Sequence, residues 1–376
     1  MMIMHFILQQ SQFALKPIIP GEHDRSSSQL HFDLQCIVRV KQSFPWTLER
    51  HYLQSHVNET HKQQLVRIFE ETRRVLLISI SNISWLNPLQ KEYLSNKIGN
   101  VTLYALYSNF NDSKKREDLS TVYNYTIKEN DYYLNEIRIR QANHIDAVKE
   151  ALLNYELSLT EEPKFLPNAR YSRLSENRVY IYAGLLEHVT DNSSDDLFKN
   201  IGRIGFALGH ELIHAIDNES LSYEAYKYGW PLLFEIRLLY AVQNKSQCLR
   251  DQYYARGATG EKNPKLNFLD EIIADNVGLK VSFNTYRRLL QQKNPGNASG
   301  DSNATLSSDR YFFLQFAKSF CGHRKGKALI EYENAVPHVL ETHRINGALS
   351  NSKEFAEAYG CPVGSPMNPV HKCTLY

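Results

Sequence analysis

Two histidines stand four residues apart in an apolar stretch, FALGHELIHAID, that runs from Phe206 to Asp217. On a helix, His210 and His214 lie on one face a turn apart, so their imidazoles can converge on one Zn²⁺ ion. Glu211 sits beside the pair, where its carboxylate can act as the general base that takes a proton from the attacking water. A short pattern with three fixed positions also arises by chance, so the hypothesis needs a third ligand.

A second segment supplies carboxylates at the spacing that a third ligand requires. From Leu269 to Lys280 the sequence is LDEIIADNVGLK, which places Glu271 and Asp275 four residues apart on one helix face. Glu271 would complete a His₂Glu ligand set and leave a fourth position for water, and Asp275 would hydrogen-bond the free nitrogen of a ligand histidine. From spacing alone, Asp270, Glu271 and Asp275 could equally form a solvated acidic face.

The elements that must position these residues are mostly helical. The run RVYIYAGLL, residues 178–186, is rich in Val, Ile and Tyr and predicts a strand followed by a turn. Residues 295–308 predict an exposed loop. Apolar periodicity and segment length predict two or three helices over residues 46–108 and further helices over residues 124–159, 201–216, 222–242, 266–293, 309–321 and 326–336.

The amino-acid composition is typical of a globular chain and does not indicate a nucleic-acid partner. Of its 376 residues, 42% are hydrophobic and 11% aromatic, and 43 Lys plus Arg balance 41 Asp plus Glu. No apolar run is long enough to span a membrane. The first eight residues, MMIMHFIL, lack the basic region of a signal peptide. We therefore expect an export signal upstream of Met1, in an N-terminus that this sequence does not include.

Cysteines and glycosylation sequons favour the secretory route. The five cysteines are far apart and form no CxxC pair. Asn-x-Ser/Thr sequons are dense for this length, although an Asn- and Ser-rich sequence yields some by chance. Exported proteins use both features, so we expect an extracellular or cell-surface glycoprotein. The ten sequons begin at Asn58, Asn82, Asn100, Asn111, Asn124, Asn192, Asn218, Asn244, Asn297 and Asn303.

Four blocks of the sequence resemble the neprilysin and endothelin-converting enzyme family of zinc metallopeptidases. GHELIHAID and DEIIADNVGL resemble that family's zinc helix and ExxAD helix. NARY at residues 168–171 resembles its NAxY motif, and YAGLL at residues 182–186 resembles the strand that follows. Residues 343–373 resemble its C-terminal signature. The resemblance runs from roughly residue 35 to the C-terminus and corresponds to the catalytic part of the family.

This resemblance assigns roles to individual residues. It implies one zinc ion per chain, with Asn168 and Ala169 binding the substrate backbone. It aligns His338 and Arg344 with the family's transition-state histidine and substrate-carbonyl arginine. By chemistry, a protonated His338 can donate to the oxyanion of the tetrahedral intermediate, and the planar fork of Arg344 can hold a carbonyl oxygen.

The cysteines are assigned in the same way. The resemblance implies a disulfide between Cys248 and Cys373, which would tie the helix after the zinc site to the C-terminus. It implies free thiols at Cys36, Cys321 and Cys361, because the family partners of these three lie in an N-terminal region that this sequence lacks. Family members also carry a membrane anchor and a helical lid domain before the region that is matched here.

The sequence departs from the family at three places. Residues 187–190, EHVT, stand where a Pro-Pro-Phe run is usual. Phe320 stands where Trp is common, and residues 373–376, CTLY, replace a final CRVW.

The resulting prediction is a predominantly α-helical α+β fold, a thermolysin-like zincin catalytic domain with a small sheet. It occupies residues 166–376, after a divergent or disordered leader at 1–35 and a helical region at 36–165. We expect a zinc-dependent endopeptidase that hydrolyses internal bonds of small peptides. The alternative is a catalytically silent or unstable truncated glycoprotein of the same family. An aminopeptidase-type or thermolysin-type enzyme would share the zinc helix, but the NAxY and C-terminal blocks argue against it.

Overall fold

The computed structural model describes residues 37–38, 52, 55, 59–105, 128, 131–153, 168–172, 177–186, 200–227, 233–255, 266–293, 302–322 and 338–376. The chain divides into two compact units, one of residues 1–51 and 111–162 and the other of residues 52–110 and 163–376. The first unit contains helix α7 (Tyr132–Leu153), inside the predicted helical segment 124–159. The predicted leader at 1–35, the predicted domain boundary at 165–166 and the predicted helix at 326–336 lie outside the described residues.

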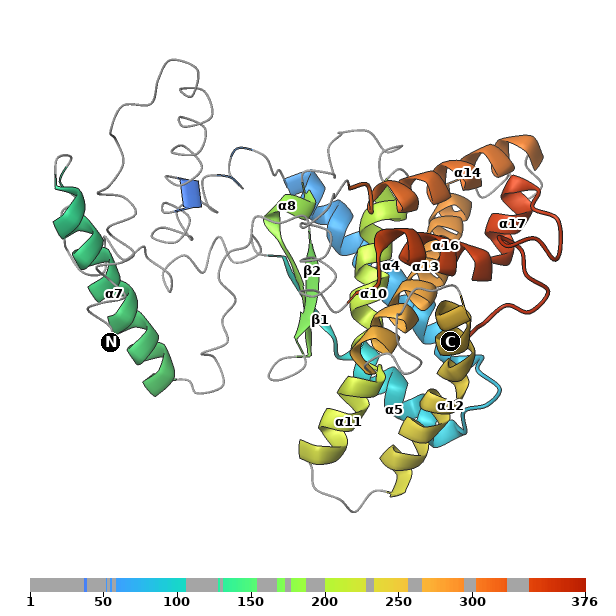
Figure 1. The fold of residues 1–376 in the computed structure, drawn as a ribbon, viewed down its shortest axis with the longest axis horizontal. Coiled ribbons are helices and arrows are strands. Elements are labelled where there is room, and N and C mark those ends of the chain that lie inside the picture. The colour runs from blue at the N-terminus through green and yellow to red at the C-terminus, as the bar shows by residue number, and fades with distance from the viewer. Residues whose placement is uncertain are drawn as a thin grey trace. The chain divides into compact units, whose positions relative to one another are not determined.

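Three helices form the centre of the second unit, and Figure 1 shows them side by side. They are α4 (Glu59–Ser81), α10 (Phe206–Ile213) and α13 (Leu266–Lys293). Along α4 the buried apolar residues recur at spacings of three and four, as in Leu65, Ile68 and Phe69, so one face of this helix packs into the core. In contrast, α10 is apolar on nearly all sides, so it is buried along its length. The polar residues that it carries therefore lie inside the molecule.

A π-helical turn, residues 201–205, leads directly into α10, so the predicted helix 201–216 is present but not uniformly α-helical. Where a single helix was predicted at 222–242, the described residues form the end of α11 (Asn218–Lys227) and the start of α12 (Leu233–Ala255), and residues 228–232 lie outside the described part of the chain. The predicted loop 295–308 is wrong from Ser302 onward, where α14 begins.

The helices that surround this centre are α5 (Pro88–Gly99), α8 (Ala183–Leu186), α11 (Asn218–Lys227), α12 (Leu233–Ala255), α14 (Ser302–Lys318), α16 (Glu341–Asn351) and α17 (Lys353–Tyr359).

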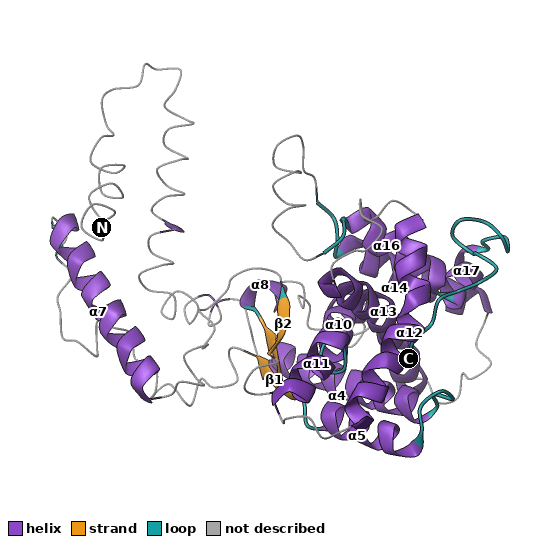
Figure 2. Cartoon of the chain, turned by 60° about the horizontal axis from the view of Figure 1, so that its bottom comes forward, coloured by secondary structure: helices purple, strands orange, loops and turns teal. Residues whose placement is uncertain are grey.

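A small sheet lies beside these helices, and Figure 2 shows its strands in orange. Its strands are β1 (Thr102–Ala105), β2 (Ala169–Ser172) and β3 (Arg178–Ile181), in the order β1-β3-β2. The central strand, β3, pairs in parallel with β1 and antiparallel with β2, which leaves β2 at an edge next to α10. The strand followed by a turn that was predicted at 178–186 is found as β3, which ends at Ile181, followed by the single helical turn α8 (Ala183–Leu186). The predicted fold class, mostly helical with one small sheet, is confirmed.

The C-terminal segment is anchored to the helical body. Cys248 on α12 forms a disulfide with Cys373, with Cα atoms 5.6 Å apart, which is the pair that the family resemblance implied. Cys321 and Cys361 carry free thiols, and Cys36 lies outside the described residues. The hydroxyl of the buried Tyr376 donates to the carbonyl of Ile216, just after the zinc-helix motif (3.1 Å). No helix in the described part of the chain is both long and apolar enough to cross a membrane.

Candidate metal centre

Two glycines allow the helices that carry the candidate ligands to approach closely. A Cβ atom added to Gly278 on α13 would lie 2.8 Å from the backbone nitrogen of His210 on α10. A Cβ added to Gly209 would lie 3.0 Å from the carbonyl oxygen of Gly278. The two backbones are therefore in direct contact at this crossing, which is why side chains on α10 and α13 can meet in one site.

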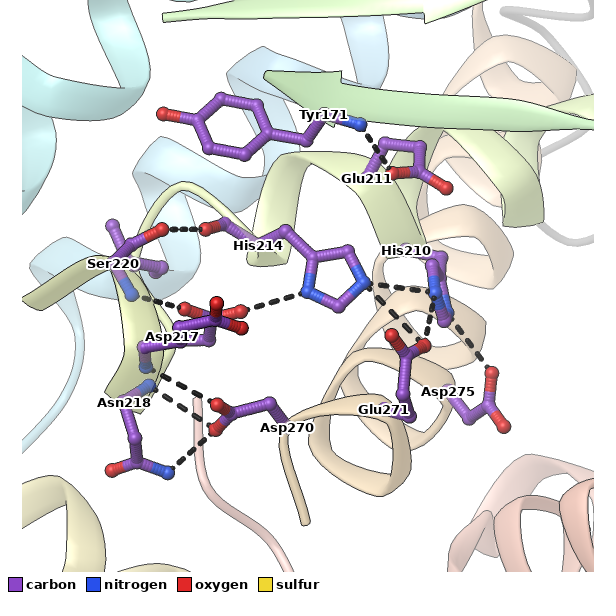
Figure 3. A network of polar contacts seen from close by, with 12 residues as sticks. Tyr171, His210, Glu211, His214, Asp217, Asn218, Ser220, Asp270, Glu271 and Asp275 are labelled. Atoms are coloured by element: carbon purple, nitrogen blue, oxygen red, sulfur yellow. Dashed lines mark hydrogen bonds and ion pairs between the residues drawn. The ribbon is translucent and has the colours of Figure 1, made fainter. Parts of the chain in front are cut away.

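The three predicted metal ligands do meet, as Figure 3 shows. Nε2 of His210 lies 3.1 Å from Nε2 of His214 and 3.0 Å from Oε2 of Glu271, and the distance from His214 Nε2 to that oxygen is 3.5 Å. A tetrahedral zinc site with bonds of about 2.0–2.1 Å separates its ligand atoms by about 3.3–3.4 Å. Within the described part of the chain, Oε2 of Glu271 is buried and accepts no hydrogen bond of standard geometry. The donor set therefore fits a zinc ion.

Each candidate imidazole is oriented through its other nitrogen by a buried carboxylate. Oδ1 of Asp275 lies 2.9 Å from Nδ1 of His210, as the sequence analysis expected, and Oδ2 of Asp217 lies 2.8 Å from Nδ1 of His214. The sequence analysis missed Asp217. The available signal was an acidic residue three positions after His214, where the helix ends and the chain can turn back. With Nδ1 occupied in both rings, both Nε2 atoms are left to face the metal position.

Arg344 holds the buried Asp275 through two hydrogen bonds. Its Nε and Nη2 atoms donate to Oδ2 and Oδ1 of Asp275 at 2.7 and 2.6 Å, and its guanidinium stacks over the ring of Phe320 at 4.8 Å. Burial by itself would raise the pKa of Asp275, but the charge and hydrogen bonds of Arg344, with those of His210, lower it to about 2. Arg344 therefore acts on the metal site through Asp275, a role that the sequence did not predict.

The other predicted site residues lie on α10, at the start of β2 and just before α16. The backbone N–H of Tyr171 on β2 donates to Oε2 of the buried Glu211 at 2.7 Å. Ala169 lies buried at the start of β2, and Asn168 precedes it with an exposed side chain. Nε2 of His338 lies 2.9 Å from Oε2 of Glu271. The residues at 187–190, which replace the family's Pro-Pro-Phe run, lie outside the described residues.

The alternative of a solvated acidic face is wrong for two of its three carboxylates. Asp270 is 2% exposed and Asp275 is 1% exposed, and both are hydrogen-bonded. Burial, with the charge of the nearby Asp217 added, raises the pKa of Asp270 to about 7. The amide of Asn218 donates to Asp270 (2.7 Å), and Asn218 itself is 2% exposed. The sequon at Asn218 is therefore closed to a glycan in the folded chain.

A His-Glu-x-x-His helix joined by a glutamate from a second helix is the ligand set of the two-histidine, one-glutamate class of zinc peptidases. The chain belongs to peptidase family M13, whose model matches residues 168–375. This agrees with the family resemblance of the sequence blocks.

Curated relatives extend the match over most of the chain. The chain is 28% identical to human endothelin-converting enzyme 1 over 347 residues, which is 91% of this chain and 44% of that protein. It is 27% identical to neprilysin-2 of Drosophila melanogaster over 341 residues, which is 86% of this chain and 42% of that protein. The chain thus spans less than half the length of these relatives.

Solved structures share the fold. PepO from Lactobacillus rhamnosis superimposes with a TM-score of 0.66 at 18% identity, covering 86% of this chain and 48% of that chain. The Mycobacterium tuberculosis zinc metalloprotease Zmp1, in complex with an inhibitor, superimposes with a TM-score of 0.62 at 20% identity over the same shares of the two chains.

Proposed function

We propose that this chain is the catalytic part of a zinc-dependent endopeptidase that hydrolyses internal bonds of small peptides. One observation carries the proposal. Three ligand atoms from His210, His214 and Glu271 converge within 3.0–3.5 Å of one another, next to the buried carboxylate of Glu211. Two imidazoles and one carboxylate leave an open fourth position, which is typical of a catalytic zinc site rather than a structural one.

The proposed chemistry divides between the metal and the side chains. Zinc held by the three ligands, one ion per chain, would supply a Lewis acid that polarises the scissile carbonyl and lowers the pKa of water to about 7. Glu211 takes the proton from the attacking water and later passes it to the leaving amine. The N–H of Tyr171 holds one oxygen of Glu211 in place (2.7 Å), so the carboxylate enters the reaction already oriented.

The edge of the sheet offers a place for the substrate backbone. In β2, the N–H of Tyr171 points away from β3 toward Glu211, and Ala169, two residues earlier, faces the same way because strand residues alternate. An extended peptide can lie along this edge, with Asn168 and Ala169 binding its backbone.

Two further residues complete the proposed site. His338 donates to the oxyanion that forms during attack. Arg344, whose plane is fixed by its two hydrogen bonds to Asp275, holds a substrate carbonyl.

The site is tested by peptide hydrolysis with the full chain. A quenched fluorescent peptide should be cleaved at an internal bond, the activity should vanish on chelation, and zinc should restore it. Glu211→Gln should keep zinc near one equivalent and lower kcat/KM by orders of magnitude, because ligation is spared and proton transfer is not. Near-normal turnover in that variant would refute the role of Glu211. A wild-type chain that binds zinc but cleaves no peptide would favour the catalytically silent glycoprotein instead.

We further propose an extracellular or cell-surface location, with peptides rather than nucleic acids as partners. The side chains of Asn82, Asn100 and Asn244 are exposed, so their sequons can carry glycans, whereas Asn218 is buried. Glycopeptide mapping of secreted protein should find sugar on some of the first three and none at Asn218. Full occupancy at Asn218 would contradict the fold around the metal site.

A further inference from the structure

A buried carboxylate that is not a metal ligand connects the two sides of the candidate zinc site. Asp270 on α13 accepts three hydrogen bonds from the first turn of α11. Its Oδ1 receives the backbone N–H and the side-chain amide of Asn218 (3.2 and 2.7 Å), and its Oδ2 receives the backbone N–H of Glu219 (3.1 Å). The first N–H groups of a helix have no hydrogen-bond partner within the helix, and they favour a negative charge nearby. The carboxylate of Asp270 is therefore a suitable acceptor for the N–H groups at the start of α11.

Both ends of this tie adjoin residues of the metal site. Asp270 directly precedes Glu271, and Asn218 directly follows Asp217, the carboxylate that orients His214 (2.8 Å). The tie therefore runs from the ligand on α13 to the residue that fixes the second imidazole, as Figure 3 shows.

The two orienting carboxylates differ in how they are held. Asp275 lies inside α13, where the helix fixes its backbone and Arg344 fixes its side chain. Asp217 lies in the turn between α10 and α11, beyond the last residue of the zinc helix. Its other oxygen accepts the backbone N–H of Ser220 at 2.7 Å, and the hydroxyl of Ser220 donates to the carbonyl of His214. The backbone hydrogen bonds of this turn are local, from Ala215 to Leu212, from Ile216 to Ile213 and from Leu221 to Asp217, so they do not fix the turn against α13. The hydrogen bonds to Asp270 do.

We propose that Asp270 is a positioning residue that fixes the turn carrying Asp217 against α13 and thereby sets the zinc affinity of the site. This inference rests on the proposed zinc site. It assigns Asp270 no contact with substrate or metal. Loss of its hydrogen bonds lets the turn move relative to Glu271, so the imidazole of His214 and the carboxylate of Glu271 no longer hold their spacing.

The test measures the zinc dissociation constant of the full chain by competition with a chelator, together with the visible spectrum of the Co²⁺-substituted protein. Partners of metal ligands typically contribute about 10–100-fold to metal affinity. Since Asp270 acts through Asn218 and Asp217, we expect Asp270→Ala to weaken zinc binding by about 10-fold and to change the Co²⁺ spectrum. The conservative Asp270→Asn keeps one acceptor oxygen and should weaken zinc binding less.

A matched control separates positioning from general stability. Asp309→Asn removes another buried carboxylate, which is 2% exposed and is paired with Arg287. Arg287 lies 16 residues beyond Glu271 on α13, or about 24 Å along the helix. This variant should lower the melting temperature and leave the zinc affinity unchanged.

A swapped pair provides a rescue. In the double variant Asn218→Asp with Asp270→Asn, the amide of residue 270 can donate to the carboxylate of residue 218 and its oxygen can still accept the N–H of Glu219, while the N–H of residue 218 loses its acceptor. Zinc affinity should therefore recover part of the loss seen in Asp270→Ala. Equal zinc affinity and equal Co²⁺ spectra in the wild type, Asp270→Asn and any folded Asp270→Ala protein would overturn the inference alone. A wild-type chain that binds no zinc would refute the proposed function itself and this inference with it.

Discussion

Replacing Gly278 by alanine tests how closely α10 and α13 must approach for the site to exist. The new Cβ would lie 2.8 Å from the backbone nitrogen of His210 and 3.0 Å from its Cα. Both are backbone atoms of a buried helix, so no flexible side chain can move aside. Ordinary contact begins at 3.4 Å, so the two helices must separate by about 0.6 Å at this point.

That separation is large for a metal site. Ligand distances in zinc sites hold to within about 0.2 Å, and His210 and Glu271 lie on the two helices that would move apart. We expect Gly278→Ala to weaken zinc binding by about 10–100-fold. Overpacking should lower the free energy of unfolding by about 1–3 kcal/mol, and the better helix propensity of alanine should return up to about 1 kcal/mol.

The assay is a zinc competition titration combined with denaturant unfolding of the zinc-free chain. Gly99→Ala on α5 is the matched control, because a Cβ there would meet nothing within 4 Å. This control should keep the zinc affinity of the wild type, and the better helix propensity of alanine should raise its free energy of unfolding by up to about 1 kcal/mol. The reasoning is refuted if Gly278→Ala binds zinc as tightly as Gly99→Ala does.

Substitutions at Arg344, at His338 and at the disulfide have distinct expected effects. Arg344→Met should raise the pKa of Asp275 from about 2 and weaken both zinc binding and substrate binding, since the buried carboxylate loses its counter-charge; unchanged zinc affinity would contradict this. His338→Leu should keep zinc and lower mainly kcat, by about 10²–10³-fold; an unchanged kcat in this variant would show that His338 has no role in catalysis. Cys248→Ser or Cys373→Ser should lower the free energy of unfolding by up to about 5 kcal/mol in the chain-entropy model, and an unchanged melting temperature would exclude a stabilising disulfide.

The central part of the site was predictable because its chemistry follows from local spacing. His210 and His214 lie four residues apart, as do Glu271 and Asp275, and helical geometry turns each spacing into a shared face. Asp217 was not predictable in this way. Its contact with His214 depends on how the chain turns after α10, which sequence periodicity does not describe.

Contacts between residues that are far apart in the sequence could not be predicted either. Arg344 and Asp275 are 69 residues apart in the sequence, and Asp270 and Asn218 are 52 residues apart. Nothing in either local sequence indicates its partner. These contacts arise because α10, α11, α13 and α16 pack together, so they became visible only in the folded chain.

Helix ends were the weakest predictions of the fold. The stretch before α14 is rich in Ser, Asn, Asp and Gly, and so predicted a loop as far as residue 308, yet the helix begins at Ser302. Polar residues of this kind favour the first turn of a helix as well as loops, since their side chains can bond free backbone groups in either setting. Composition alone could not separate the two.

The most direct test of the account is a zinc titration of the full chain and of Glu271→Val, with the metal content measured after dialysis. The account predicts one tightly held zinc ion per wild-type chain and loss of that ion in the variant, because the two histidines alone make an incomplete site. A wild-type chain that retains no zinc, or a Glu271→Val chain that retains it as tightly, would contradict the assignment of His210, His214 and Glu271 as the metal ligands.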